Sequence, residues 1–123
     1  MGFSEFELKY IETLVGKLCK QRSPSHLRDQ LRAVYVVEEH DVIVYVERPD
    51  GSNPREWTSC GVAKFKYNRE QNVWKLYWMR QNLKWHPYRP LPESTRIDRL
   101  VIEVDKDPYG TFFGRASRVR QEA

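Results

Sequence analysis

Apolar residues recur at helical spacing along the first twenty residues of the chain. Ser4, followed three residues later by Glu7, forms a capping box, and Phe3 is placed to pack onto Leu8 as a hydrophobic staple. We expect this helix to end near residue 22, because a proline at position 24 disfavours helical geometry in the residue before it. The predicted buried stripe consists of Leu8, Ile11, Leu14, Val15, Leu18 and Cys19.

The middle of the chain has the pattern of antiparallel strands. Segments 31–38 and 42–48 are rich in Val, Ile and Tyr and are joined by a short polar break, which predicts a hairpin. Residues 49–58 contain Asp50-Gly51 and Asn53-Pro54, so we expect a loop there.

A second hairpin is predicted over 62–68 and 73–80, which flank a four-residue connection. Pairing these strands so that Phe65 faces Leu76 collects their large apolar side chains on one face. The exceptions are Val62, Val73, Tyr77 and Met79. A turn at residues 81–82 then returns the chain over 83–88. We expect Trp78 to face Trp85 there, which puts Trp74, Trp78 and Trp85 on one largely buried face with Phe65 and Tyr67.

The C-terminal part predicts a second helix, over 95–106, with Ser94 or Thr95 as N-cap. Its apolar stripe is Ile97, Leu100, Val101 and Val104, and Phe112-Phe113 should fold back to close the core. The element order predicts an α+β fold, an antiparallel β-meander of about five strands flanked by an N-terminal and a C-terminal helix. Residues 1–114 form a single domain on this interpretation, and residues 115–123 form a flexible basic tail.

Length and composition agree with one domain: 123 residues, 40% of them hydrophobic, with a net charge of +4. No apolar run approaches the roughly 18 residues of a membrane helix. Cys19 and Cys60 have neither metal-ligand spacing nor the pattern of a disulfide framework. We therefore expect free thiols and a cytoplasmic location, with no membrane partner.

The sequence contains no recognisable catalytic constellation. Its three histidines fall in different predicted elements without a second ligand nearby, and its glycines form no phosphate-binding loop. The best arrangement for a metal-dependent hydrolase pairs Glu47 with Lys64 or Lys66 across strands, but the Glu-x-Lys pattern of such enzymes is missing. We expect no catalytic residue, no metal and no cofactor; the hydrolase stays open as a weak alternative.

Charge is segregated along the chain. Segment 49–90 has eight basic and three acidic residues, a net charge of +5, and it holds all four tryptophans. The predicted register brings Tyr77 opposite His86, Met79 opposite Lys84 and Lys75 opposite Tyr88 on the outer sheet face. The candidate binding residues on that face are Lys64, Lys66, Lys75, Tyr77, Lys84, His86 and Tyr88.

Lysines bind phosphates and flat aromatic rings stack on bases, so this face predicts a non-enzymatic binding module for nucleic acid or another polyanion. Arg115, Arg118 and Arg120 of the tail would add phosphate contacts. Two other interpretations remain. The face is simply solvated or covered by a helix, or the protein is an interaction or regulatory subunit that binds a protein partner through Trp57 and the 49–58 loop. The oligomeric state is not predicted.

Several segments of the sequence carry a resemblance to a known family. They are Arg22, Pro24, Arg28-Asp29-Gln30, Glu56-Trp57-Thr58, the run from Trp74 to Arg80, the run from Lys84 to Tyr88, and the ending from Val104 to Gly114. Together they resemble a family of small bacterial proteins known only as a domain of unknown function, number three thousand and twenty-four. The resemblance extends over nearly the whole chain to Gly114 and departs at Phe113, where the family has tryptophan. It implies a small cytoplasmic bacterial protein and no established activity.

Overall fold

A computed structural model of the chain describes residues 2–27 and 29–114. Arg28 and the predicted tail 115–123, with its three arginines, lie outside the described residues. Within the described ranges no helix is long and apolar enough to cross a membrane. The elements in chain order are α1 (Glu5–Ile11), the π-helical turn η1 (Glu12–Gly16), α2 (Lys17–Gln21), the 3-10 turn η2 (Ser25–Leu27), β1 (Arg32–Glu38), β2 (Asp41–Pro49), β3 (Trp57–Asn68), β4 (Val73–Met79), β5 (Trp85–Pro87), β6 (Glu93–Ser94) and α3 (Ile97–Lys106).

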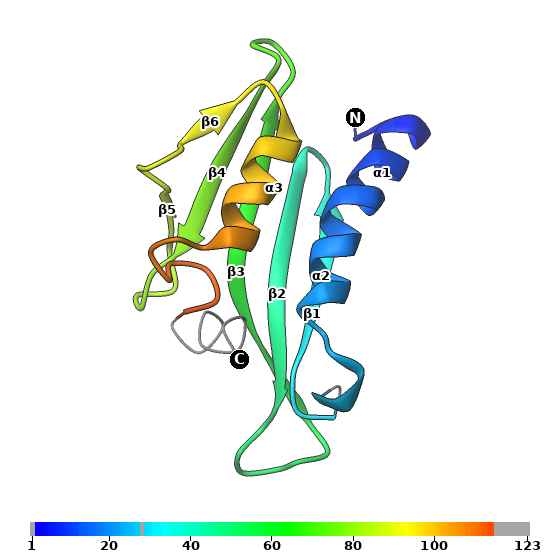
Figure 1. Cartoon of the computed structure of the whole chain (residues 1–123), viewed down its shortest axis with the longest axis vertical. Coiled ribbons are helices and arrows are strands. Elements are labelled where there is room, and N and C mark those ends of the chain that lie inside the picture. The colour runs from blue at the N-terminus through cyan, green and yellow to red at the C-terminus, as the bar shows by residue number, and fades with distance from the viewer. Residues whose placement is uncertain (1, 28, 115–123) are drawn as a thin grey trace.

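The fold has two layers (Figure 1). The strands form an antiparallel meander in the order β1-β2-β3-β4-β5, and the short β6 pairs with β4. The N-terminal helical segment and α3 lie side by side on the same face of this sheet. The predicted α+β class and the two flanking helices are therefore confirmed, and both helices leave the opposite sheet face uncovered.

The N-terminal helix begins as its capping box predicts. The side chain of Ser4 accepts a hydrogen bond from the Glu7 amide, and the Glu7 carboxylate accepts one from the Ser4 amide. The expected staple of Phe3 onto Leu8 is wrong. Phe3 instead stacks on Trp74 with 5.5 Å between ring centroids, and Leu8 stays 39% exposed. An indole on the sheet offers Phe3 a larger apolar surface than a leucine in its own helix.

The β3–β4 register is the predicted one. Phe65 pairs with Leu76 and Tyr67 with Trp74, and both Phe65 and Leu76 are fully buried. The loop expected over 49–58 is shorter than predicted, because β3 begins at Trp57 and continues the pairing with β2 as far as Pro49. The long β2–β3 hairpin consequently extends beyond the ends of both helices (Figure 1).

The predicted register of the last hairpin is wrong by one residue. Trp78 pairs with His86 and Met79 with Trp85, so Trp85 lies on the opposite sheet face from Trp74 and Trp78. The turn causes the shift. Leu83 adopts a left-handed conformation (φ 61°) and makes a three-residue loop, closed by the Arg80 amide donating to the Lys84 carbonyl. Trp74 is buried as expected, whereas Trp78 is only half-buried.

The predicted N-caps of α3 are also incorrect. Ser94 ends β6, the helix begins at Ile97, and Arg96 occupies the cap position without a side-chain capping bond. The buried stripe of α3 agrees with the prediction, as does the burial of Phe112.

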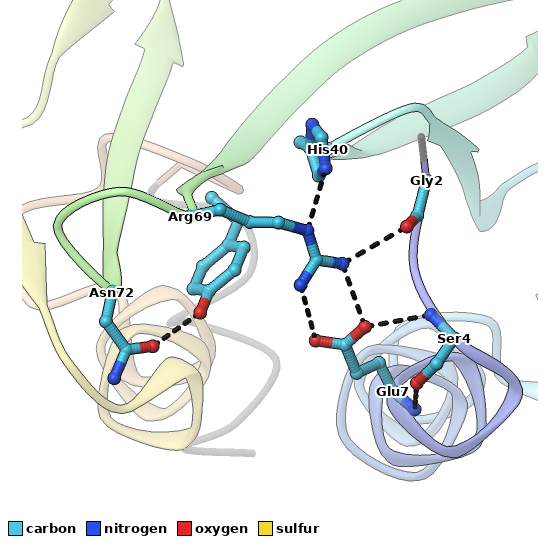
Figure 2. A network of polar contacts seen from close by, with 7 residues as sticks. Gly2, Ser4, Glu7, His40, Arg69 and Asn72 are labelled. Carbon is cyan, nitrogen blue, oxygen red and sulfur yellow. Dashed lines mark hydrogen bonds and ion pairs between the residues drawn. The ribbon is translucent and has the colours of Figure 1, made fainter.

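Arg69, in the β3–β4 hairpin, ties the start of α1 to the sheet (Figure 2). Its guanidinium donates to the Glu7 carboxylate, with 2.9 Å between Nη2 and Oε1, to the Gly2 carbonyl and to Nε2 of His40. The nearby Tyr67 hydroxyl donates to the side chain of Asn72. One side chain thus links the N-terminus, the β1–β2 turn and the second hairpin.

The Arg69–Glu7 contact makes a pH-dependent contribution to stability. Hydrogen bonds from Arg69, and then from the Ser4 amide, hold the pKa of the Glu7 carboxyl below its ordinary value. Glu7 therefore stabilises the fold above the pKa of the unfolded chain, and that contribution is lost as the pH falls through the folded-state value. We predict that Arg69→Gln raises the pKa of Glu7 in an NMR titration. Its destabilisation should become smaller as the pH falls through the folded-state pKa of Glu7, and the part due to the contacts with Gly2 and His40 should remain.

Arg96→Gln serves as the matched control for that titration. Arg96 pairs with Asp98 at 2.6 Å and does not contribute to the lowered pKa of Glu7. It should raise the pKa of Asp98 and leave that of Glu7 unchanged. An unchanged Glu7 pKa in Arg69→Gln would contradict the contact.

Candidate functional site

The face of the sheet turned away from the helices, here called the open face, follows from strand alternation. Cα partners share a face, so the pairing places the same rows of side chains across β1 to β5. One row runs from Val36 through Ile43 and Lys64 to Tyr77. The other open-face residues include Arg32, Val34, Glu38, Asp41, Tyr45, Glu47, Gly61, Lys66, Lys75, Met79 and Trp85.

Four of the seven predicted binding residues lie together on the open face, namely Lys64, Lys66, Lys75 and Tyr77. Lys84 is exposed in the turn before β5. His86 and Tyr88 are on the other side, because the one-residue shift of β5 reverses them. Tyr88 is 1% exposed, packs on Phe112 and donates its hydroxyl to Glu103 at 2.7 Å, while His86 faces Trp78.

Trp85 replaces those two residues on the open face. A Cβ on Gly61 would stand 2.9 Å from Cη2 of Trp85 and 3.0 Å from Cε of Met79, so the glycine leaves the room that the indole occupies. The ring reaches from β5 across β4 to β3, and Nζ of Lys64 stands 5.9 Å from it. The sequence did not predict Trp85 on the open face, because the predicted register of the last hairpin is wrong by one residue.

Carboxylates also lie on the open face. Asp41 pairs with Lys64 at 3.7 Å, and Glu93 of β6 lies opposite Lys75. Glu47 is the Cα partner of Arg32 and of Ser59, and its Oε1 stands 2.7 Å from Nε of Arg32. Glu47 and Lys64 are therefore not cross-strand neighbours, contrary to the hydrolase arrangement considered from the sequence. The Arg32 guanidinium also covers the Trp57 ring at 3.8 Å.

The helix side of the sheet holds a cavity of about 810 Å³, where the β2–β3 hairpin extends past the helices. We call it the arm cavity. Its walls come from the end of α2, the two arms of the hairpin and the loop after α3. They include Arg22 and Pro24, Thr58, Met79, and Thr111 to Phe113, which belong to segments that carry the family resemblance in the sequence.

The loop after α3 is held by one carboxylate. Asp107 is 1% exposed, ends α3 in a left-handed conformation, and accepts hydrogen bonds from the amides of Phe112, Phe113 and Gly114 at 3.0, 2.8 and 3.1 Å. This contact fixes Phe112 and Phe113 as walls of the arm cavity. The Asp-Pro-x-Gly turn was visible in the sequence, but the three amides that the carboxylate binds were not.

Arg22 lies where α2, α3 and that loop meet. Its guanidinium covers the Phe113 ring at 4.2 Å, donates to the Asp105 carbonyl and stands 3.5 Å from the Asp105 carboxylate. Burial lowers the pKa of Arg22, and the carboxylates of Asp105 and Asp107 act in the opposite direction. The side chain, only 11% exposed, stays cationic because an arginine is not deprotonated in proteins.

Both cysteines are free thiols. Cys19 is buried in the core, where desolvation raises its pKa to about 12, whereas Cys60 is exposed and lines the arm cavity. Among residues 2–27 and 29–114, no group of three His, Cys, Asp or Glu side chains is placed to hold a metal ion.

Comparison with known proteins identifies the family. The family model described as Domain of unknown function (DUF3024) matches residues 3–114, so the chain belongs to that family. No solved structure matches the chain.

The role of Asp107 gives a stability prediction. Asp107→Asn leaves one oxygen for three amide donors and turns an amide toward them, so the free energy of unfolding should fall by about 3 kcal/mol. Asp105→Asn, whose carboxylate is 44% exposed, should cost less than about 1 kcal/mol. Urea unfolding of both variants measures the difference. Equal effects would mean that Asp107 does not hold the loop.

Proposed function

We propose that this protein is a non-enzymatic binding module for single-stranded nucleic acid and that the open face is its binding surface. The observation that carries the proposal is the alternation of lysines with flat rings on an uncovered sheet. Tyr77 lies opposite Lys64 and one row from the Lys66–Lys75 pair, and Nζ of Lys64 stands 5.9 Å from the Trp85 ring. Single-strand binders combine backbone-tracking cations with aromatic platforms in this way.

The aromatic rings of the open face support nucleic-acid binding more strongly than its lysines do. Trp85 lies over Gly61 and beside Met79, and it is only half-buried. A base stacked on this ring would have Lys64 beside it to contact the adjoining phosphate. Stacking is tolerant of sequence because every base has a π-face.

The charges favour modest affinity. Lys66 is exposed, but Asp41 and Glu93 are close to the other two lysines. An electrostatic contribution from few uncompensated cations is small and sensitive to salt. A single strand suits such a surface better than a duplex, because stacking on a protein ring requires unpaired bases.

A protein partner is the second candidate function. The middle of the β1–β2 half of the open face is apolar, with Val34, Val36, Ile43 and Tyr45 as neighbours, and Val36 is 41% exposed. Interfaces between proteins are often apolar at the centre and polar at the rim. This candidate predicts no oligonucleotide binding at low salt.

Charge substitution tests the lysines. We predict that replacing Lys64, Lys66 and Lys75 together with glutamine weakens binding of a fluorescent single-stranded oligonucleotide and lowers the slope of log K against log salt by about 2, since each phosphate contact contributes about 0.7. The control replaces Lys9, Lys17 and Lys20, which are exposed on the N-terminal helix and carry the same charge. Equal affinities and salt slopes of the two variants in fluorescence anisotropy would reject the open face as the binding surface.

Removal of one ring tests stacking separately. Trp85→Leu keeps apolar cover over Gly61 but removes the flat surface, so we predict about tenfold weaker binding with an unchanged salt slope. Tyr109→Leu is the control, because Tyr109 is an exposed aromatic residue (68%) in the loop after α3. Circular dichroism establishes that both variants are folded. Unaltered affinity in Trp85→Leu would remove stacking from the proposal.

A further inference from the structure

The lining of the arm cavity includes none of the open-face lysines, Tyr77 or Trp85, although Gly61 and Met79 lie against both the cavity and Trp85. The arm cavity is large enough to hold a small molecule. Its volume of about 810 Å³ falls in the range of ligand pockets, which is roughly 300–1,000 Å³. It opens on the helix side of the sheet, whereas Tyr77 and the open-face lysines are on the other side.

The walls of the arm cavity divide into an apolar and a polar part. Val46, Val62 and Phe112 belong to the core or pack against it, so they make the inner wall. Toward the tip of the hairpin, Arg48 and Thr58 are Cα partners one step beyond Val46 and Cys60 on the same strand face. A ligand in this space would have its apolar body inside and its polar group near the tip.

Two arginines make the lining of the arm cavity positively charged, Arg48 toward the tip of the hairpin and Arg22 at the end of α2. A guanidinium has five N–H donors, and the described residues accept only from Nη2 of Arg22. Within residues 2–27 and 29–114, Arg48 makes no ion pair. Asp105 is the one acidic side chain on the wall, so the lining keeps a net positive charge.

From this geometry we infer that the arm cavity binds a small organic anion, a carboxylate or phosphate group attached to an apolar body. The anionic group meets the guanidinium of Arg48 and the free donors of Arg22. The apolar body packs along Val46, Val62 and Phe112. Arg22 is held in place by Phe113 and Asp105, and Phe113 in turn by Asp107. Little ordering is therefore required on binding.

Cys60 reports occupancy of the arm cavity directly. Its thiol is exposed on the cavity wall, while Cys19 is buried and has a raised pKa, so a thiol reagent labels Cys60 first. The probe is 8-anilinonaphthalene-1-sulfonate, an aromatic anion that fluoresces when it leaves water. We expect the saturating probe to slow labelling of Cys60 at least tenfold in the full chain.

Substitution of Arg48 tests the anion contact. Arg48→Gln should weaken probe binding about tenfold, the loss typical of a charge-assisted hydrogen bond. Arg55→Gln is the control, since Arg55 is exposed in the same hairpin and does not line the arm cavity. Displacement by 1-naphthoate and by 1-naphthyl phosphate separates a carboxylate from a phosphate ligand, and neutral 1-naphthalenemethanol should compete about tenfold less well.

Unprotected Cys60 at saturating probe, or equal affinity in Arg48→Gln and the parent, would overturn the inference. Tyr77 lies on the open face and does not line the arm cavity, so a loss of probe binding in Tyr77→Leu would place the probe on the open face and also overturn the inference. Oligonucleotide binding by Arg48→Gln stays at the parental level in either case, so failure here is distinguishable from failure of the proposed function.

Discussion

The pairing of β3 with β4 determines which side chains face the helices and which face water. With Phe65 opposite Leu76, every second residue of both strands joins the core, and Lys64, Lys66, Lys75 and Tyr77 are directed to the other face. A shift of one residue would bury lysines beneath α3. The cost of desolvating unpaired charges therefore excludes the alternative register.

The one-sided packing of the helices has two consequences for binding. Neither helix covers the open face, which carries Trp85 and Tyr77. The one-sided packing also leaves the arms of the β2–β3 hairpin extending beyond the helix ends, where the end of α2 and the loop after α3 complete the walls of the arm cavity. Asp107 holds the loop after α3 in one position, because its buried carboxylate is stable only where the three amide donors of that loop are fixed.

Local patterns in the sequence were sufficient to predict much of the fold. The Ser4–Glu7 capping box and the β3–β4 register depend on residues close in sequence, and both were predicted. The β4–β5 register was missed because it depends on the left-handed conformation of Leu83, which is uncommon for a leucine. That single turn moved His86 and Tyr88 off the candidate site and brought Trp85 onto it. The arm cavity joins four distant segments, so no local pattern predicts it.

Mapping the binding surface by NMR tests the central claim, that the face left bare by the helices binds nucleic acid. Titration of the labelled protein with a short single-stranded oligonucleotide should shift the amides of Lys66 and Lys75 and the indole N–H of Trp85. The indole of Trp74, covered by Phe3 on the helix side, should not shift. Shifts confined to α3 and the walls of the arm cavity, or no shifts at low salt, would contradict the claim.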